Sequence, residues 1–249
     1  MQAIGIIGGT GLETARPLVE RRVLEMTTAY GPVTLIEGNA DGVEIVFISR
    51  HGSEHETLAH AVNHRANIAA LRDRGVRQVI ATNAVGSLRP DLPPGRLVIL
   101  SDFIDMTRRR HEPLDPSRET HVDFTTPYCP RLRAALLRAA RSRGLDVEPS
   151  GVYLGVDGPR FETPAEVRAF GILGADVVGM TGLPEAVLAR EAGLCYAAIA
   201  VVTNFAAGIT ADGVAHDRVA LAAQKSAPTL WDLAIASATL AGDPESCQR

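Results

Sequence analysis

The sequence predicts a single α/β domain, and three observations lead to this prediction. Short apolar runs at residues 3–7, 43–48 and 76–81 are typical of buried strands. A helix-like stretch from about residue 60 to 74 separates the second run from the third, which is the order of a crossover unit. The chain has 249 residues, a length that one α/β domain commonly reaches.

Later segments continue the alternation of strands and helices. Two of the predicted helices begin with a proline, whose missing N–H costs no hydrogen bond at that position. The predicted elements are a strand at 97–100, a helix from about 131 to 143, a strand at 151–156, helices at about 164–170 and 184–191, a strand at 196–203 and a long amphipathic helix at about 213–240. We expect the domain to cover residues 1–241 and a short tail to follow at 242–249.

Composition excludes several classes of protein. Hydrophobic residues make up 46% of the chain and charged residues 22%, so a core can form without metals or disulfides. The net charge of −4 and the lack of long Lys or Arg runs argue against a nucleic-acid partner. No apolar run approaches the roughly 20 residues of a membrane helix, and no export signal is recognisable. Three distant cysteines without a CxxC pair predict neither a disulfide framework nor a zinc site, so we expect a cytoplasmic protein.

The first candidate site is the turn Gly8-Gly9-Thr10-Gly11, which follows the strand at 3–7. Glycine lets backbone N–H groups approach an anion closely, and Thr10 adds a hydroxyl. A purely structural turn is one alternative. A dinucleotide-binding loop is another, but the spacing G-x-x-G-G-x-G differs from the dinucleotide fingerprint.

A second candidate is Arg50-His51-Gly52, which follows the strand at 43–48. It places a guanidinium and an imidazole at the carboxyl edge of a strand, where open α/β sheets usually bind ligands. The alternative is a structural salt bridge for Arg50 and a capping role for His51. The four histidines at 51, 55, 60 and 64 lack the spacing of a metal site, so we expect no metal.

Two further segments combine small residues with groups that bind ligands. Residues 83–87, Asn-Ala-Val-Gly-Ser, follow the strand at 76–81 and let the backbone reach a ligand. Residues 158–163 place the ring of Phe161 beside the carboxylate of Glu162, which suits stacking a flat base and accepting its ring N–H. The alternative is a helix N-terminus in which Glu162 complements the dipole and Phe161 enters the core. The sequence has no nucleophile elbow that would indicate covalent hydrolysis.

Taken together, these segments resemble the family of trimeric purine nucleoside phosphorylases and methylthioadenosine phosphorylases. The resemblance spans nearly the whole chain and rests on residues 4–12 (IGIIGGTGL), 62–68 (VNHRANI), 102–107 (DFIDMT), 158–163 (GPRFET), 174–181 (GADVVGMT) and 202–208 (VTNFAAG). It implies a three-layer α/β sandwich around a mixed, partly barrel-like sheet, assembled as a homotrimer. It also implies phosphorolysis of a purine nucleoside, with inorganic phosphate as a co-substrate and without a cofactor.

The resemblance also implies roles for individual residues. Met180 would lie against the ribose, Phe161 would pack on the base, and Asn204 and Glu162 would contact the edge of the base. His121 would reach the sugar end of a neighbouring subunit's site. The implied phosphate-binding residues are Thr10, Arg50, His51, Ala84 through its backbone, and Thr181. The implied catalytic residues are Asn204, Glu162 and His51.

Two positions bear on the substrate. The methylthioadenosine enzymes typically carry Asp at the position of Asn204, whereas an Asn amide donates to a 6-oxo group and Glu162 accepts the ring N–H of a 6-oxopurine. His216 matches a His that contacts the 5′-hydroxyl, which favours inosine or guanosine. The alternatives are that His216 is a solvated residue at the start of the last helix and that Val219 and Ala220 line an apolar 5′ pocket. The alternatives are methylthioinosine phosphorylase, then methylthioadenosine phosphorylase, and from other classes a non-catalytic nucleoside-binding protein or a nicotinamide-dependent oxidoreductase.

Overall fold

The computed structural model of the chain describes residues 3–9, 11–52, 56–108, 112–115, 117, 121–211 and 213–242. A short 3₁₀ turn covers Ala59–Ala61. The main elements, in chain order, are β1 (Ile4–Gly8), β2 (Val19–Thr28), β3 (Gly31–Ala40), β4 (Val43–Ser49), α1 (His64–Asp73), β5 (Gln78–Ser87), β6 (Leu97–Asp105), α2 (Pro130–Ser142), β7 (Val147–Gly155), α3 (Pro164–Ile172), β8 (Val177–Gly179), α4 (Gly182–Glu191), β9 (Cys195–Phe205) and α5 (His216–Ala241).

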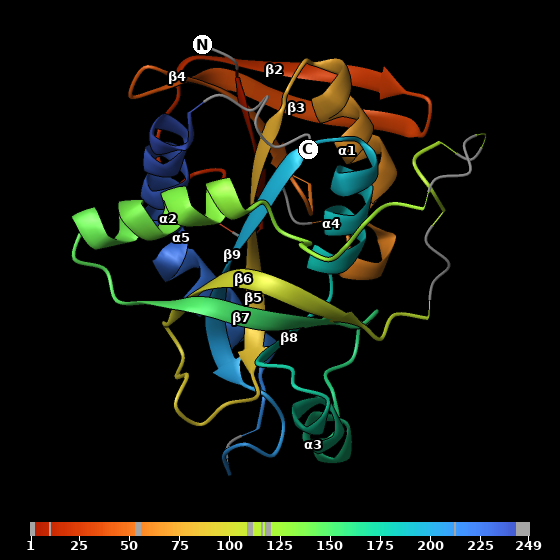
Figure 1. The fold of residues 1–249 in the computed structure, drawn as a ribbon, viewed down its shortest axis with the longest axis vertical. Helices are drawn as coiled ribbons and strands as arrows, with labels where there is room; N and C mark the ends of the chain where they lie inside the picture. The colour runs from red at the N-terminus through yellow and green to blue at the C-terminus, as the bar shows by residue number, and fades with distance from the viewer. Residues whose placement is uncertain are drawn as a thin grey trace.

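The strands form one mixed sheet, part of which closes on itself. Within the described residues it has nine strands in the order β2-β3-β4-β1-β5-β8-β7-β6-β9, and β9 returns to pair with β5. The strands β5, β8, β7, β6 and β9 therefore close into a barrel, from which β1, β4, β3 and β2 continue as an open sheet (Figure 1). The parallel strands β4, β1, β5 and β9 bring their carboxyl ends to one edge. The predicted α/β class with a mixed, partly barrel-like sheet is confirmed.

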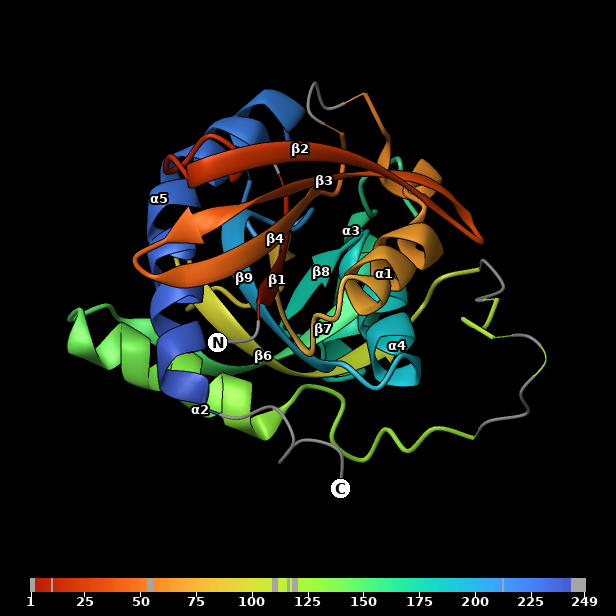
Figure 2. The same cartoon turned by 90° about the horizontal axis from the view of Figure 1, so that it is seen from above.

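Helices cover both faces of the sheet (Figure 2). On one face α1 and α4 pack around a core that includes Leu71 and Leu183. On the other face α2 and α5 pack around a second core that includes Leu136 and Trp231. Because each face of the sheet buries its own apolar cluster, the chain forms the three layers that the resemblance implied.

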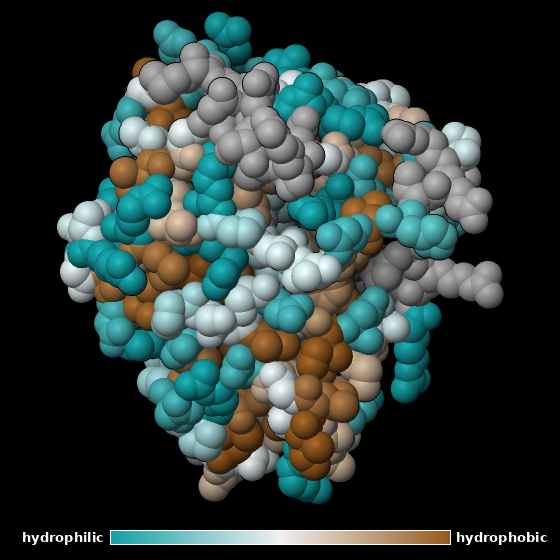
Figure 3. Space-filling view, viewed as in Figure 1, coloured by the Kyte–Doolittle hydropathy of each residue, from teal (hydrophilic) through white to brown (hydrophobic). Residues whose placement is uncertain are grey.

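The surface mixes polar and apolar side chains, and apolar ones gather over α3 at one end of the molecule (Figure 3). Ile172 and Leu173, at the end of this helix, are 87% and 53% exposed. Among the described residues, no helical segment combines the length and the apolar character that crossing a bilayer requires.

The hairpin of β2 and β3 is absent from the sequence prediction. Strand β2 lies at the edge of the sheet, and most of its residues are exposed, including Glu20, Arg21 and Arg22. The alternation of apolar and polar residues that reveals a half-buried strand is therefore weak in β2. Strand β8 is also missing from the prediction, because its 3 residues are too few to establish a period.

Several boundaries differ from the predicted ones, and two of the differences change the reading of the site. Strand β5 does not end near Ala81 but continues to Ser87, because residues 83–87 pair with β9. Strand β9 likewise continues to Phe205, so Asn204 is a strand residue. The predicted segments at 83–87 and 203–204 thus lie on the barrel wall itself, which holds them more rigidly than loops would.

The helix predicted from about residue 60 begins only at His64. The side chain of Asn63 accepts a hydrogen bond from the backbone N–H of Ala66 at 3.1 Å, which caps the first turn of α1. The last helix, predicted from about residue 213, begins at His216 and contains Pro228. These shifts leave the order of elements unchanged.

Candidate active site

A cavity of about 300 Å³ lies at the edge of the sheet where the parallel strands end. Its volume is within the range of small-molecule sites. The residues that line it come from the turn after β1 (Gly9, Leu12), the end of β4 (Arg50, His51), residues 57–59, strand β5 (Thr82, Asn83, Ala84, Val85, Gly86), the 159–162 segment (Pro159, Phe161, Glu162), residues 178–181 (Val178, Gly179, Met180, Thr181), strand β9 (Val201, Thr203, Asn204) and helix α5 (Val219, Ala223, Ala227, Leu230).

One end of the cavity is cationic because of Arg50. Its guanidinium is 1% exposed and donates to both carboxylate oxygens of Glu185 at 2.8 Å, while Nη1 donates to the backbone oxygen of Thr82 at 2.8 Å. These bonds use three of the five N–H donors of an arginine, which leaves one on each terminal nitrogen for a ligand. Both functions considered for Arg50 therefore coexist: it makes a buried salt bridge and it lines the cavity.

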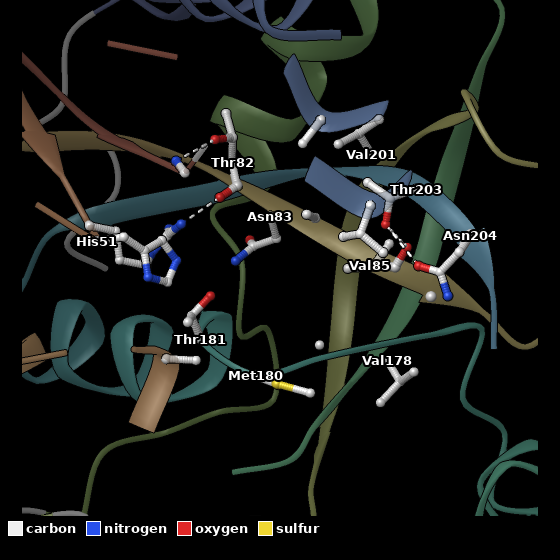
Figure 4. Close-up of a pocket in the computed structure, with 18 of the residues that line it drawn as sticks. His51, Thr82, Asn83, Val85, Val178, Met180, Thr181, Val201, Thr203 and Asn204 are labelled. Atoms are coloured by element: carbon white, nitrogen blue, oxygen red, sulfur yellow. Dashed lines mark hydrogen bonds between the residues drawn. The ribbon is translucent and has the colours of Figure 1, made fainter. Parts of the chain in front are cut away.

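His51 stands beside this cationic end (Figure 4). Its Nδ1 lies 2.9 Å from the backbone oxygen of Thr57. A carbonyl oxygen only accepts, so this contact fixes a ring form that carries a proton on Nδ1. The contact orients the imidazole at the wall of the cavity.

The residue before the N-terminus of α4 also lines the cavity. Thr181 precedes this helix and is 9% exposed, and Figure 4 draws its hydroxyl facing Asn83 across the cavity. The backbone N–H groups of Thr181 and Gly182 donate to the hydroxyl of Tyr153, at 3.3 and 3.1 Å. Tyr153 thus holds the start of the helix in place, and the Thr181 hydroxyl is the group that this residue presents to a ligand.

The side chain of Asn83 was not predicted from the sequence, which singled out residues 83–87 only for their backbone. It is 2% exposed, and neither its amide nitrogen nor its amide oxygen has a hydrogen-bond partner among the described residues. A buried amide without partners is costly, so such a group in a cavity wall points to a ligand. The preceding strand residues are mostly apolar, and the only sequence signal was the polar side chain on an otherwise buried strand. Its neighbour Ala84 is exposed to the cavity although Asn83 and Val85 are buried.

The other end of the cavity carries Asn204 on β9. Its Oδ1 accepts from the hydroxyl of Thr203 at 2.9 Å, and its Nδ2 donates to the backbone oxygen of Phe205 at 2.8 Å (Figure 4). Thr203 is 6% exposed, and its hydroxyl also lies 3.1 Å from the backbone oxygen of Val85. These contacts fix the amide, which keeps a second donor and a second lone pair for a ligand.

Phe161, Glu162 and Met180 also line the cavity. Burial raises the pKa of the Glu162 carboxyl above its usual range, and nearby Glu166 raises it further. A more basic carboxylate is a stronger hydrogen-bond acceptor for a ring N–H. Met180 packs on Gly158, whose φ is +67° and where an added Cβ would overlap the Met180 sulfur. A glycine at 158 is therefore needed for this segment to approach the cavity.

An apolar wall faces these polar groups. It is formed by Leu12 and by the Val219, Ala223, Ala227 and Leu230 side chains of α5. Val219 lines the cavity as expected for an apolar pocket, whereas Ala220 is not among the lining residues. The cavity thus combines the Arg50 guanidinium at one end, the Asn204 amide at the other, the Glu162 carboxylate and an apolar side.

The structure brings together most of the residues named from the sequence. Arg50, His51, Ala84, Phe161, Glu162, Met180, Thr181 and Asn204 all line this cavity. Thr10 lies outside the described residues, and so does the side chain of His216, although its backbone begins α5. His121 is exposed and is not among the residues that line the cavity.

Comparison with known proteins identifies the family of the chain. Residues 3–238 match the model of the phosphorylase superfamily. "Probable 6-oxopurine nucleoside phosphorylase" of Thermococcus kodakarensis is 49% identical over 91% of this chain and 88% of its own length. "Probable S-methyl-5′-thioinosine phosphorylase" of Methanopyrus kandleri is 47% identical over 84% of this chain and 81% of its own.

A solved structure of a phosphorylase has the same fold as this chain. Methylthioadenosine phosphorylase of Schistosoma mansoni, in complex with adenine, superposes with a TM-score of 0.91 at 34% identity, over 100% of this chain and 95% of that chain. The extent of these matches and the shared fold lead to one conclusion. The chain belongs to the phosphorylase superfamily.

Proposed function

We propose that this protein cleaves 6-oxopurine nucleosides with inorganic phosphate, giving the free base and ribose 1-phosphate. The observation that carries the proposal is one cavity with the buried Arg50 guanidinium at one end and the fixed Asn204 amide at the other. A phosphate anion needs a cationic donor such as Arg50, and the edge of a purine needs a hydrogen-bonding group such as the Asn204 amide. Relatives at 44% to 49% identity that are named 6-oxopurine nucleoside phosphorylases support the same activity.

Phosphate would bind at the cationic end. Arg50 supplies the charge and two N–H donors, and Thr181, His51 and Ala84, which line the same cavity, would add the threonine hydroxyl, the imidazole ring and a backbone N–H. Thr10 would add a hydroxyl from the glycine turn. Arginine suits this role because its planar fork matches the oxygens of a phosphate. No metal or organic cofactor takes part in the proposed reaction.

The purine would bind at the Asn204 end, with Phe161 against its face. The Asn204 amide has a donor for the 6-oxo group, and the Glu162 carboxylate accepts the ring N–H that only a 6-oxopurine carries. Bound phosphate attacks the anomeric carbon with inversion while the bond to the base breaks. The departing base takes up negative charge, which the Asn204 and Glu162 contacts stabilise in a site already arranged for it.

A second candidate is S-methyl-5′-thioinosine phosphorylase. Leu12, Val219 and Ala223 give the cavity an apolar side, which suits a 5′-methylthio group better than a 5′-hydroxyl. Relatives from Methanopyrus kandleri and Methanothermobacter thermautotrophicus carry this name. Both candidates share the base and the phosphate and differ only in the 5′ substituent.

A panel of four nucleosides tests the proposal and separates the candidates. We expect inosine, guanosine or methylthioinosine to be consumed only when phosphate is present, and methylthioadenosine to react at least about tenfold more slowly, since a mismatched base edge costs about 1–3 kcal/mol. The measurement is the change in absorbance with and without phosphate. A kcat/KM for methylthioinosine above that for inosine selects the second candidate. Consumption without phosphate, or no consumption of any of the four, contradicts the proposal.

Asn83 gives a prediction in which stability and activity move in opposite directions. The change Asn83→Leu removes a buried amide without partners, so the ligand-free protein should gain stability, by about 1–3 kcal/mol. If the amide donates to or accepts from bound phosphate or ribose, kcat/KM for phosphate or for the nucleoside, respectively, should fall by about tenfold or more. The measurements are thermal or urea unfolding and steady-state kinetics.

The control is Asn39→Ala, which removes the hydrogen bond that its Oδ1 accepts from the backbone N–H of Gly42 at 2.9 Å, outside the cavity. It should lower stability by about 1 kcal/mol and leave turnover unchanged. An Asn83→Leu variant that keeps full activity would exclude a role for this side chain in binding.

We also infer a homotrimer whose active sites are shared between subunits. The support is the family resemblance together with His121, which is exposed and lies outside its own cavity. The segment that carries it is attached to the body of the subunit, because Arg190 donates to the backbone oxygen of Asp123 at 3.3 Å. A trimeric mass in solution is expected, and a monomer at working concentration would contradict the shared site.

The cytoplasmic location remains a prediction from the sparse cysteines.

A further inference from the structure

The carboxylate of Glu185 lies directly behind the cationic end of the cavity. It comes from α4, it is fully buried, and it is not among the residues that line the cavity. Its two oxygens accept from Nε and Nη2 of Arg50, both at 2.8 Å. Two parallel hydrogen bonds of this kind fix the plane of a guanidinium as well as its position.

Glu185 is itself held by two other elements. The hydroxyl of Tyr196, on β9, donates to its Oε1 at 2.8 Å. Nδ1 of His64, at the start of α1, lies 3.7 Å from its Oε2. The ring of Tyr196 stacks on that of Tyr128 with the centroids 6.0 Å apart. The carboxylate thus sits at a point where α1, α4 and β9 meet, and none of the groups that hold it has to touch a ligand.

The electrostatics keep this carboxylate ionised. Burial alone would raise the pKa of Glu185, but the charge and the hydrogen bonds of Arg50, together with His64, lower it to about 2. Burial alone would likewise lower the pKa of Arg50, and the Glu185 carboxylate raises it instead. The pair is therefore charged throughout the neutral pH range.

Such a pair is poorly explained by stability alone. Removing two charges from water costs several kcal/mol per ion, and replacing a buried ion pair by packed apolar side chains is often neutral or stabilising. What the pair does supply is a fixed direction for the remaining N–H groups of Arg50. A third bond, from Nη1 to the backbone oxygen of Thr82 at 2.8 Å, constrains the same group from another side.

We propose that Glu185 is a positioning residue for phosphate: it holds the Arg50 fork so that the remaining N–H on each terminal nitrogen faces the bound anion. This inference rests on the proposed phosphorolysis. Glu185 acts through Arg50 and does not contact the substrate. Tyr196 assists by holding Oε1 of the carboxylate.

The decisive variant is Glu185→Gln. The new amide keeps the size of the side chain, but it presents N–H groups to one of the Arg50 donors, so the fork can no longer sit in its plane. We expect KM for phosphate to rise by about tenfold or more while KM for the nucleoside changes less than about twofold. A role limited to stability would alter neither KM. A role in screening the charge of Arg50 would lower KM for phosphate, and either result overturns the proposal.

A matched control is available at the surface. Asp232 accepts from Nε and Nη2 of Arg16 at 3.0 and 2.8 Å, with the same fork geometry but outside the cavity. Asp232→Asn makes the same chemical change and should leave both KM values as they are. If it raised KM for phosphate as much as Glu185→Gln does, the effect would not be specific to the cavity, and the proposal would be wrong.

Tyr196→Phe keeps the test decisive if Glu185→Gln does not fold. It removes one hydrogen bond to Glu185 and leaves the charge pair in place, so KM for phosphate should rise about two- to fivefold with KM for the nucleoside unchanged. An unchanged KM for phosphate in this folded variant overturns the proposal. Wild-type protein that consumes no nucleoside with phosphate would instead refute the proposed function, so the two failures are distinguishable.

Discussion

Replacing Arg50 by methionine is expected to lower kcat/KM for phosphate by about 100- to 1,000-fold. The guanidinium is the only arginine or lysine group among the described residues that line the cavity, and it is 1% exposed. Methionine approximates the length of the side chain without its charge. Steady-state kinetics at varied phosphate measure the effect, and a folded variant with an ordinary KM for phosphate would contradict the assignment of the cationic end.

The same substitution should also destabilise the protein. It leaves Glu185 buried without its partner, and the loss of one member of a buried ion pair typically costs about 3–5 kcal/mol. The double variant Arg50→Met/Glu185→Gln removes the unpaired charge, so it should recover much of the stability and none of the activity. Recovery of activity together with stability would mean that Arg50 acts only in folding.

The second large effect is expected at Asn204. The change Asn204→Asp replaces the donor that faces a 6-oxo group by an acceptor, so kcat/KM for inosine should fall by about ten- to hundredfold. The preference between bases should shift towards adenosine, whose 6-amino group is a donor. The measurement is kcat/KM for inosine and for adenosine in parallel. Unchanged turnover of inosine without any gain on adenosine would contradict the role of Asn204.

The surroundings of Asn204 set a limit on that shift. The hydroxyl of Thr203 donates to Oδ1 and would continue to do so in the aspartate. The second oxygen, however, would take the place of Nδ2, which lies 2.8 Å from the backbone oxygen of Phe205. Two acceptors at that distance repel each other, so the loss on inosine should exceed the gain on adenosine. Asn204→Ala, which removes both the donor and the acceptor, is the control and should lower turnover of both nucleosides.

The α/β class of the fold follows from the sequence because buried strands and amphipathic helices carry local patterns. The apolar strand β1, the helix α2 and the proline-initiated helix α3 are visible in this way. Strand β2 is not, because an exposed edge strand has no buried face to mark its period. Closure of the barrel is also invisible from local patterns, since it depends on the pairing of β5 with β9, which lies far later in the chain.

The candidate site divides in a similar way. Arg50 and Asn204 stand out in the sequence because they follow apolar runs, and Glu162 because it stands beside an aromatic residue next to a turn. The resemblance assigned all three to one site. Asn83 was hidden, since a polar side chain in a strand is more often satisfied by its neighbours. Its status as a buried amide without partners among the described residues is known only from the packing around it.

The sequence by itself determined the α/β class, the family resemblance and the types of side chain that serve an anion and a purine edge. These features are local, because each depends on residue type and on short spacings along the chain. Only the tertiary structure decided that Arg50 is fixed from behind by Glu185, that β5 and β9 carry Asn83 and Asn204 on one barrel wall, and that α5 gives the cavity an apolar side. The physical reason is that burial and hydrogen-bond partners arise between segments far apart in the chain, so no local pattern contains them.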